Sequence, residues 1–309
     1  MAAIAVVYCH AFATGRGSAG VDLFFVISGF IIARVSKDRP AADFAKARFW
    51  RIYPIYLWAV AAPILWEVTS GTGLTTRVAA TLSLWPIWAG QYQQPLLPVA
   101  WSLYFEILFY AGMTAWLFSR RAALTAASGI LLLALFRPSQ VTAFLLSPII
   151  LEFVAGYAIS RLRSFRFAAP ALIVGVILLF GSTREFDAAT MLDASTASLR
   201  ALVFGIPAAM IVYGALGLER LFAGRWANPL VWAGDASYSI YLVHLFPINA
   251  LSGSSEAMPA IRFVAGVAAG LVVYSFVERP LGQWVARRNR RRRPVHANRV
   301  AANELAGQG

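Results

Sequence analysis

"VVYCHAFATGRGSAGVDLFFVISGFII" extends from Val6 to Ile32, and the fold prediction for this chain starts from its pattern. Both ends of the segment are apolar, and small residues and glycines separate them. Within it stand one histidine, His10, and one carboxylate, Asp22. The pattern predicts two membrane helices joined by a short turn, each with an ionisable side chain that lipid would exclude.

The rest of the chain has the same apolar character. Its 309 residues are 59% hydrophobic and 13% charged, whereas soluble domains are about 45–50% apolar and about 25% charged. Apolar stretches recur near the ~20 residues that a helix needs to cross a ~30 Å hydrocarbon core. We therefore predict an all-α, polytopic membrane protein. Its expected transmembrane helices, about ten, are residues 1–14, 20–36, 50–69, 97–118, 122–137, 143–160, 167–182, 198–218, 230–251 and 259–281.

Basic loops after every second span indicate the orientation. Segments such as "RVSKDRPAADFAKARFWR" after the second span and "RLRSFR" after the sixth are rich in arginine, and the loops between them are small and polar. The positive-inside rule then places both termini in the cytoplasm of a multi-pass protein of the cell (inner) membrane. Residues 75–92 would invert this order as a further span. Because Trp85, Trp88 and Tyr92 suit a membrane–water boundary, we expect a re-entrant or interfacial segment there.

The C-terminal tail is strongly basic. Its segment "ARRNRRRRPVHANR" contributes much of the formal charge of +13. Since it directly follows a membrane span, we favour contact with anionic lipids over binding to nucleic acid. Residues 1–286 are therefore expected to form one transmembrane domain, and residues 287–309 a basic, disordered cytoplasmic tail.

His10 and Asp22 are the first candidates for chemistry. The nine residues from Ala11 to Ala19 are few enough to bring the two side chains close together. A carboxylate beside a neutral imidazole fixes its tautomer and raises its basicity, as a general base requires. A buried hydrogen bond that only joins two helices explains the two residues equally well. The sequence by itself leaves both interpretations open.

Arg48 and Arg51 form an R-x-x-R motif at the expected cytoplasmic end of the third span. Residues three apart share a helix face, so both guanidinium groups could bind one phosphorylated ligand. Positive-inside anchoring is the alternative, and for the motif taken alone it is the favoured one.

The fourth span contains a second group of polar residues. Trp101, Ser102 and Glu106 lie in its expected outer half, and Ser102 and Glu106 share a helix face. An unpaired glutamate within a span is costly, which indicates either function or a buried partner such as an arginine.

The ninth and tenth spans contain the last polar group. Tyr238, Tyr241 and His244 share one face of the ninth span. Glu278 and Arg279, at the inner end of the tenth span, are expected to form a salt bridge near the interface.

Taken together and in order, these motifs resemble one family. "GVDLFFVISGFII" with the histidine before it, "RFWRIYPIY", "WSLYFE", and "SYSIYLVH" followed by "VERP" are similar to the membrane acyltransferase-3 family, and most to its exopolysaccharide and O-antigen O-acetyltransferase branch. The resemblance covers nearly the whole chain, from His10 to Pro280. Its members are similar ten-helix proteins that transfer an acyl group, commonly acetyl from cytoplasmic acetyl-CoA, to a sugar hydroxyl of a surface or secreted glycan.

The resemblance implies a role for each motif. The family's essential histidine corresponds to His10, and its R-x-x-R, implicated in handling the acyl donor, corresponds to Arg48 and Arg51. Its Trp-Ser-Leu…Glu motif corresponds to Trp101, Ser102, Leu103 and Glu106. The residues expected to contact substrate are Trp101, Ser102, Tyr238, Tyr241 and His244.

One feature of the family pattern is missing. The family has an arginine eleven positions before its histidine, and that position falls one residue before Met1. The first expected span is also short, because fourteen residues give roughly 21 Å against the ~30 Å that is needed. Both observations lead us to expect an N-terminally truncated sequence or a start site assigned too late.

The predicted function is that of an integral-membrane O-acyltransferase. His10, oriented by Asp22 or Glu106, would accept the proton of a sugar hydroxyl, a kind of help worth about 10²–10⁴ in rate, or would itself carry the acyl group. The acceptor would be a cell-surface or secreted polysaccharide or its lipid-linked precursor. Acetyl-CoA or another acyl-CoA is the expected co-substrate. No bound cofactor or metal is expected, since the one cysteine, Cys9, gives no cysteine-based metal site.

Two other functions stay open. A transporter or flippase for a lipid-linked sugar or small solute would line its passage with the same polar residues. It ranks lower because the chain lacks paired halves with corresponding broken helices. A sensor or scaffold has only the arginine tail in its favour.

Overall fold

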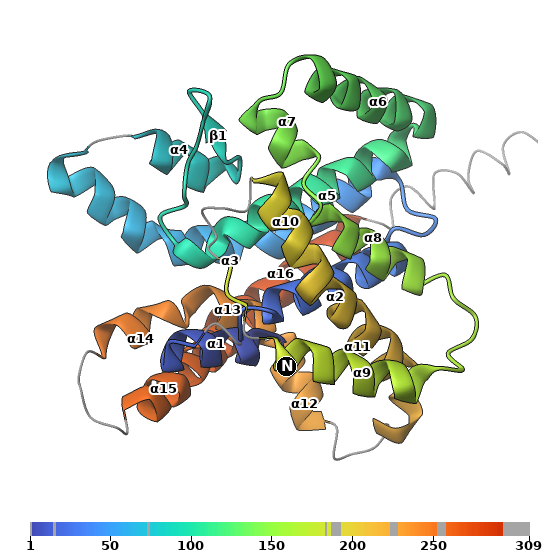
Figure 1. Cartoon of the computed structure of the whole chain (residues 1–309). Helices are drawn as coiled ribbons and strands as arrows, with labels where there is room; N and C mark the ends of the chain where they lie inside the picture. Colours follow the sequence, from blue (N-terminus) through green and yellow to red (C-terminus); the bar gives the residue numbers. More distant parts are fainter. Residues whose placement is uncertain are drawn as a thin grey trace, which may run out of the picture.

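The computed structural model describes residues 2–14, 17–72, 75–182, 184–186, 193–222, 228–251 and 258–292. These residues form a bundle of helices with one short β-hairpin (Figure 1), in agreement with the predicted all-α class. Four helical segments among them are long and apolar enough to cross a membrane: Ala41–Ser70, Gln140–Ile159, Ala194–Gly217 and Met258–Val285. The architecture is that of a helical membrane protein, and the number of ten spans stays a prediction.

The N-terminal part begins as the sequence predicts, with two helices joined by a short turn. They are α1 (Ala2–Phe12) and α2 (Gly20–Val35). The third helix, α3 (Ala41–Glu67), begins directly after Pro40, earlier than predicted, and continues in a π-helical turn, Val68–Thr72. As a consequence, Arg48 and Arg51 lie inside a continuous helix instead of at its first turn.

Residues 75–92 contain no spanning helix. They form α4 (Thr76–Ser83), β1 (Ile87–Trp88) and β2 (Gln91–Tyr92), and the two strands pair antiparallel. The two residues between the strands, Ala89 and Gly90, both have positive φ, as a two-residue hairpin turn requires. This compact, irregular shape fits the expectation for the segment, and its position in the membrane stays a prediction.

The middle of the chain is a series of helices with short connections. They are a 3₁₀ turn (Pro98–Ala100), α5 (Trp101–Phe118), α6 (Arg120–Phe136), α7 (Gln140–Leu145), α8 (Ile150–Ile159), α9 (Ala168–Gly181), α10 (Ala194–Arg200), a π-helical turn (Ala201–Gly205), α11 (Ile206–Gly217) and a 3₁₀ turn (Glu219–Phe222). The carboxylate of Asp193 begins α10 by accepting the Thr196 backbone N–H. Hydrogen bonds from Ser195 and Thr196 hold the pKa of this carboxyl below its usual range.

The C-terminal part divides the expected ninth span into three short helices. They are α12 (Asn228–Asp235), α13 (Ser237–Val243) and α14 (Leu245–Ala250), and His244 lies at the junction of the last two. There follow α15 (Met258–Val273), a π-helical turn (Tyr274–Glu278) and α16 (Arg279–Arg292). The predicted tail therefore starts as helix through Arg292, and its residues 293–309 lie outside the described part of the chain.

The helix α2 lies in the middle of the bundle and contacts α1, α5, α8 and α11 (Figure 1). Its approach to α8 is exceptionally close: a Cβ at Gly29 would collide with the Phe153 backbone, and a Cβ at Gly156 with the Val26 carbonyl. Small residues that let two backbones touch are typical of helix contacts in membranes. The glycine pair thus fixes α2, which contains Asp22, against α8.

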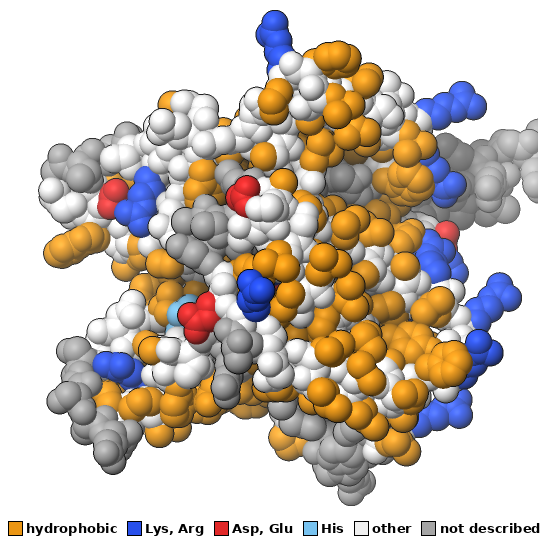
Figure 2. Space-filling view, viewed as in Figure 1, with side chains coloured by type: hydrophobic (Ala, Val, Ile, Leu, Met, Phe, Trp, Pro, Cys, Tyr) orange, Lys and Arg blue, Asp and Glu red, His pale blue; other side chains and the backbone are white. Residues whose placement is uncertain are grey.

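The surface is apolar where the bundle would face lipid. Large hydrophobic side chains such as Phe118, Phe136 and Phe276 are more than three-quarters exposed. Figure 2 shows hydrophobic side chains over α8, α9 and α11, while Lys and Arg gather toward the right-hand edge of the view. An apolar girdle with cations at one end suits a bilayer and the positive-inside pattern.

Candidate active site

His10 lies in the last turn of α1, and its side chain is exposed to a cavity. This cavity, which we call the histidine cavity, has a volume of about 260 Å³. Nδ1 of His10 lies 2.9 Å from the carbonyl oxygen of Val6. Because a carbonyl can only accept, the partner assigns a proton to Nδ1 and leaves a lone pair on Nε2. His10 thus has the tautomer of a general base.

The side chain of His244 contacts the ring of His10. Its Nε2 lies 3.3 Å from Nδ1 of His10, and the ring centroids are 5.1 Å apart. The contact joins α1 to the α13–α14 junction, two segments far apart in the chain. His244 is fully buried, whereas His10 is exposed. A fully buried ring does not fit the predicted role of His244 in binding substrate.

Asp22 does not contact His10, which corrects the predicted pairing. Both of its oxygens accept from Arg200: Nε lies 3.0 Å from Oδ1, and the second nitrogen, Nη2, lies 2.6 Å from Oδ2. Nη2 also donates to the carbonyl of Ser18 at 3.2 Å. The cation outcompetes a neutral imidazole for the carboxylate, since charge-assisted bidentate bonds are the stronger ones. Both interpretations of His10 and Asp22 required contact between them, so neither holds as made; Asp22 instead joins α2 to α10 through Arg200.

No role for Arg200 was predicted from the sequence. It ends α10 with its side chain 1% exposed, and its guanidinium lies 5.4 to 5.7 Å from the ring centroids of Trp101, Phe186 and Phe204. The sequence did contain a signal: Arg200 lies inside one expected span and Asp22 inside another, and two opposite charges within the membrane are expected to pair. Arg200 and Trp101 also line the histidine cavity.

Glu106 lies away from His10, so it is not the carboxylate that orients it. Its side chain is buried in α5 and accepts a hydrogen bond of 2.5 Å from the Tyr110 hydroxyl. It lines a second cavity of about 340 Å³, the central cavity, together with Arg48 and Arg51. Its Oε2 has no hydrogen-bond partner among the described residues, so the arginines line the same cavity without forming the buried ion pair that was expected for Glu106.

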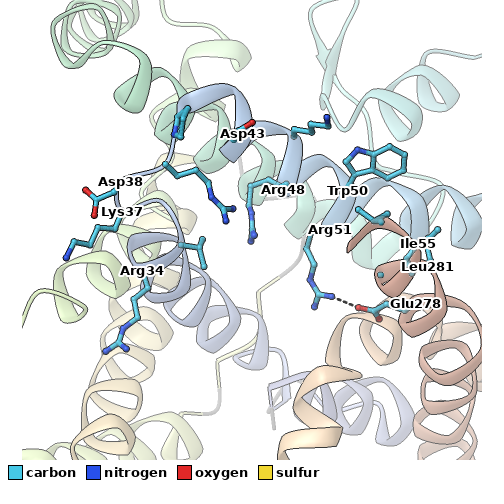
Figure 3. A pocket seen from close by; sticks show the side chains of 17 residues that line it. Arg34, Lys37, Asp38, Asp43, Arg48, Trp50, Arg51, Ile55, Glu278 and Leu281 are labelled. Carbon is cyan, nitrogen blue, oxygen red and sulfur yellow. Dashed lines mark hydrogen bonds and ion pairs between the residues drawn. The ribbon is translucent and has the colours of Figure 1, made fainter. Parts of the chain in front are cut away.

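Arg48 and Arg51 share one face of α3, as their spacing predicts. Figure 3 shows both side chains extending into a third cavity of about 870 Å³, the basic cavity. Its further charged residues are Arg34, Lys37, Asp38, Arg39, Asp43, Lys46 and Glu278. Nε of Arg48 is buried without a hydrogen-bond partner among the described residues. The hydrogen-bonding capacity of this nitrogen is therefore not used by the described part of the chain.

Glu278 pairs with Arg51, not with its neighbour Arg279 as predicted. Its Oε1 lies 2.5 Å from Arg51, and its Oε2 accepts from the Ser239 hydroxyl at 2.6 Å. The reason is geometric: the π-helical turn that contains Glu278 turns its side chain inward, to a 7% exposed position. Arg51 is thereby held at the wall of the basic cavity.

The central cavity adjoins each of the other two cavities. Arg48 and Arg51 line both the basic and the central cavity, and Val6, Val21 and Tyr241 line both the central and the histidine cavity. The hydroxyl of Tyr241 lies 2.7 Å from Oγ of Ser102 and 2.5 Å from the Val99 carbonyl.

These contacts place the remaining predicted residues. Ser102 is buried and supports Tyr241 at the boundary between the central and histidine cavities. Tyr238 lines the central cavity and donates to the Ile52 carbonyl at 3.0 Å. Trp101, Tyr238 and Tyr241 are thus in reach of a ligand in one of the cavities, which leaves their predicted role in binding substrate open to test.

Comparisons with known proteins identify the family of the chain. A family model of the acyltransferase-3 family, described as an acyltransferase domain, matches residues 1–278. The chain belongs to this family. It is 35% identical over 303 residues to the exopolysaccharide production protein ExoZ of Rhizobium meliloti (strain 1021), covering 90% of this chain and 92% of that protein. It is 25% identical over 342 residues to the acyltransferase MdmB of Streptomyces mycarofaciens, covering 91% of this chain and 84% of that one. No solved structure gives a significant match.

Membership of the acyltransferase-3 family and the apolar helices together make this protein a membrane acyltransferase. The family match covers His10, both arginines of the R-x-x-R motif, Glu106 and His244.

Proposed function

We propose that this acyltransferase moves an acyl group, acetyl in the first place, from a cytoplasmic acyl-CoA to a sugar hydroxyl of an exopolysaccharide or other cell-surface glycan. The observation that supports it most is the series of adjoining cavities from the arginine pair to His10. One end of this path has the charge that a phosphorylated donor needs, and the other end presents a base. The name of the relative ExoZ, an exopolysaccharide production protein, supports a polysaccharide acceptor.

The basic cavity is the proposed donor site. Its volume of about 870 Å³ and its arginines and lysines suit the phosphates of CoA. Arg48 would bind them with its guanidinium group at the cavity wall, and Arg51 would do so from the position that Glu278 fixes. The pantetheine arm would then extend through the central cavity, where apolar residues such as Phe24 and Ile52 line the wall.

The histidine cavity is the proposed site of reaction. Nε2 of His10 accepts the proton of the sugar hydroxyl while the hydroxyl oxygen attacks the thioester carbonyl. The C–S bond breaks, the ester C–O bond forms, and the proton passes from His10 to the departing CoA sulfur. A variant of the scheme has Nε2 of His10 attack first and hold the acyl group before the sugar takes it. Both variants use the same ring nitrogen.

The donor enters from the cytoplasmic side in this proposal. The basic cavity is lined by arginines and lysines of the segment from the end of α2 to the start of α3, and by the positive-inside rule such a segment lies in the cytoplasm. The protein would then lie in the inner membrane with both termini cytoplasmic and its arginine-rich tail near anionic lipids.

Purified protein in liposomes tests this function. Vesicles would be loaded with acetyl-CoA labelled in the acetyl group, and polysaccharide of the native host, de-esterified with mild alkali, would be added outside. The proposal predicts label in alkali-labile ester on the polysaccharide together with release of free CoA. Uptake of sugar or solute without any turnover of acetyl-CoA would reject it in favour of a transporter.

A further inference from the structure

The contact between His10 and His244 has a defined polarity. Nδ1 of His244 lies 2.8 Å from the Tyr241 carbonyl oxygen and 3.1 Å from that of Ile240. Both partners are acceptors only, so Nδ1 of His244 bears the proton and its Nε2 has a free lone pair. That lone pair faces Nδ1 of His10, which bears a proton for the same reason. The one proton on Nδ1 of His10 therefore has two acceptors: the Val6 carbonyl at 2.9 Å and, in the longer arm of a shared hydrogen bond, Nε2 of His244 at 3.3 Å.

We infer that His244 is a positioning residue for His10, in the place that a carboxylate takes in other histidine bases. Its lone pair is a second acceptor, beside the Val6 carbonyl, for the Nδ1 proton of His10; it keeps Nε2 directed into the histidine cavity and steadies the N–H of the imidazolium that forms when Nε2 takes a proton. This inference rests on the proposed function. It also explains how His10 can be oriented although Asp22 and Glu106 are both engaged elsewhere.

The surroundings of His244 hold its ring in place. Its side chain is fully buried, and α15 packs directly over it, since a Cβ at Gly266 would lie 3.3 Å from the Cβ of His244 and 3.0 Å from Val7 on α1. Close packing of α1, α13 and α15 thus brings the two rings together. His244 lines none of the three cavities, so its ring is not placed to bind substrate. It can instead orient the ring of His10, which lines the histidine cavity.

A structural alternative must be separated from this role. The ring Nδ1–H of His244 also donates to two carbonyls in the last turn of α13. On this alternative, the residue serves only as a helix cap. The two functions use opposite sides of the ring. His244→Asn keeps a donor near the Nδ1 position but has nothing that reaches His10. His244→Gln is longer by one methylene and places an amide oxygen near the Nε2 position.

The experiment compares these two variants in liposomes, with acetyl-CoA and the de-esterified host polysaccharide as substrates. We expect His244→Asn to lower kcat by about 10- to 100-fold, the usual effect of losing an orienting partner, with the KM for acetyl-CoA and the melting temperature close to wild type. His244→Gln should regain at least a third of the wild-type kcat. Ile248→Val, a conservative change at a nearby buried position on α14, should leave kcat unchanged.

Equal kcat values for the Asn and Gln variants would overturn the inference, whether both are active or both are inactive while folded. If His244→Asn does not fold, a folded His244→Gln with less than a hundredth of the wild-type kcat would overturn it as well, and one with at least a third would support it. The proposed function fails separately: wild-type protein that transfers no acetyl group, or His10→Ala protein with full activity, would reject the function itself.

Discussion

Arg200 and Asp22 form a bidentate ion pair with both side chains almost completely buried, and the guanidinium nitrogens lie 3.0 and 2.6 Å from the two carboxylate oxygens. The pair joins the start of α2 to the end of α10 across 178 residues of sequence. Because both oxygens of Asp22 accept hydrogen bonds from Arg200, this carboxylate does not contact His10. This relationship separates the residues that stabilise the bundle from those that we assign to the reaction.

The first prediction concerns stability. Asp22→Asn removes the carboxylate that accepts two hydrogen bonds from the buried Arg200 guanidinium, and breaking such a pair costs about 3–5 kcal/mol. Thermal unfolding in detergent should show a large drop in melting temperature and less protein in the membrane. Asp43→Asn is the control, because Asp43 is exposed on α3. An Asp22→Asn protein with the same melting temperature as wild type would refute a structural role for the pair.

A second prediction concerns the donor. Arg48→Ala should weaken CoA binding by about 10- to 150-fold, since hydrogen bonds to charged groups contribute about 1.5–3 kcal/mol. Arg48→Lys should restore little, because an ammonium cannot form the planar, bidentate contact. Isothermal titration of the purified protein with CoA measures both. Arg161→Ala removes the same charge from a residue that bonds Tyr157 and lines none of the three cavities, and it should bind CoA normally. Equal affinities for the Arg48 and Arg161 variants would exclude the basic cavity as the donor site.

The third prediction concerns the contact between α2 and α8. Gly156→Ala should lower the free energy of unfolding by about 1–3 kcal/mol, because the new methyl group overlaps the Val26 carbonyl and the two helices must separate. Gly112→Ala is the matched control: no atom lies within 4 Å of its Cβ position, and alanine favours helix there. Similar melting temperatures for the two variants would show that the close approach is unimportant.

Local features of this molecule could be predicted from the sequence. Helix periodicity and spacing placed Arg48 and Arg51 on one face, and the small residues after His10 marked the turn before α2. The interruptions were harder to predict. A run of apolar residues such as 230–251 has the composition of one span, whereas tertiary packing breaks it at His244 into α13 and α14.

Pairings between distant residues could not be predicted. His10 contacts His244, Arg51 contacts Glu278, and Arg200 contacts Asp22, at separations of 234, 227 and 178 residues. A single sequence shows that a buried charge needs a partner, but several candidates satisfy that need equally. Packing decides among them, and it gave His10 a neutral histidine in place of the expected carboxylate.

The central claim is that His10 is the group that takes part in acyl transfer. The most direct measurement is the ester content of the host's extracellular polysaccharide by NMR, in a deletion strain that expresses either wild-type protein or His10→Ala at equal membrane levels. We predict that wild type restores the ester signals and that His10→Ala restores none. Ester signals of wild-type intensity in the His10→Ala strain would contradict the account.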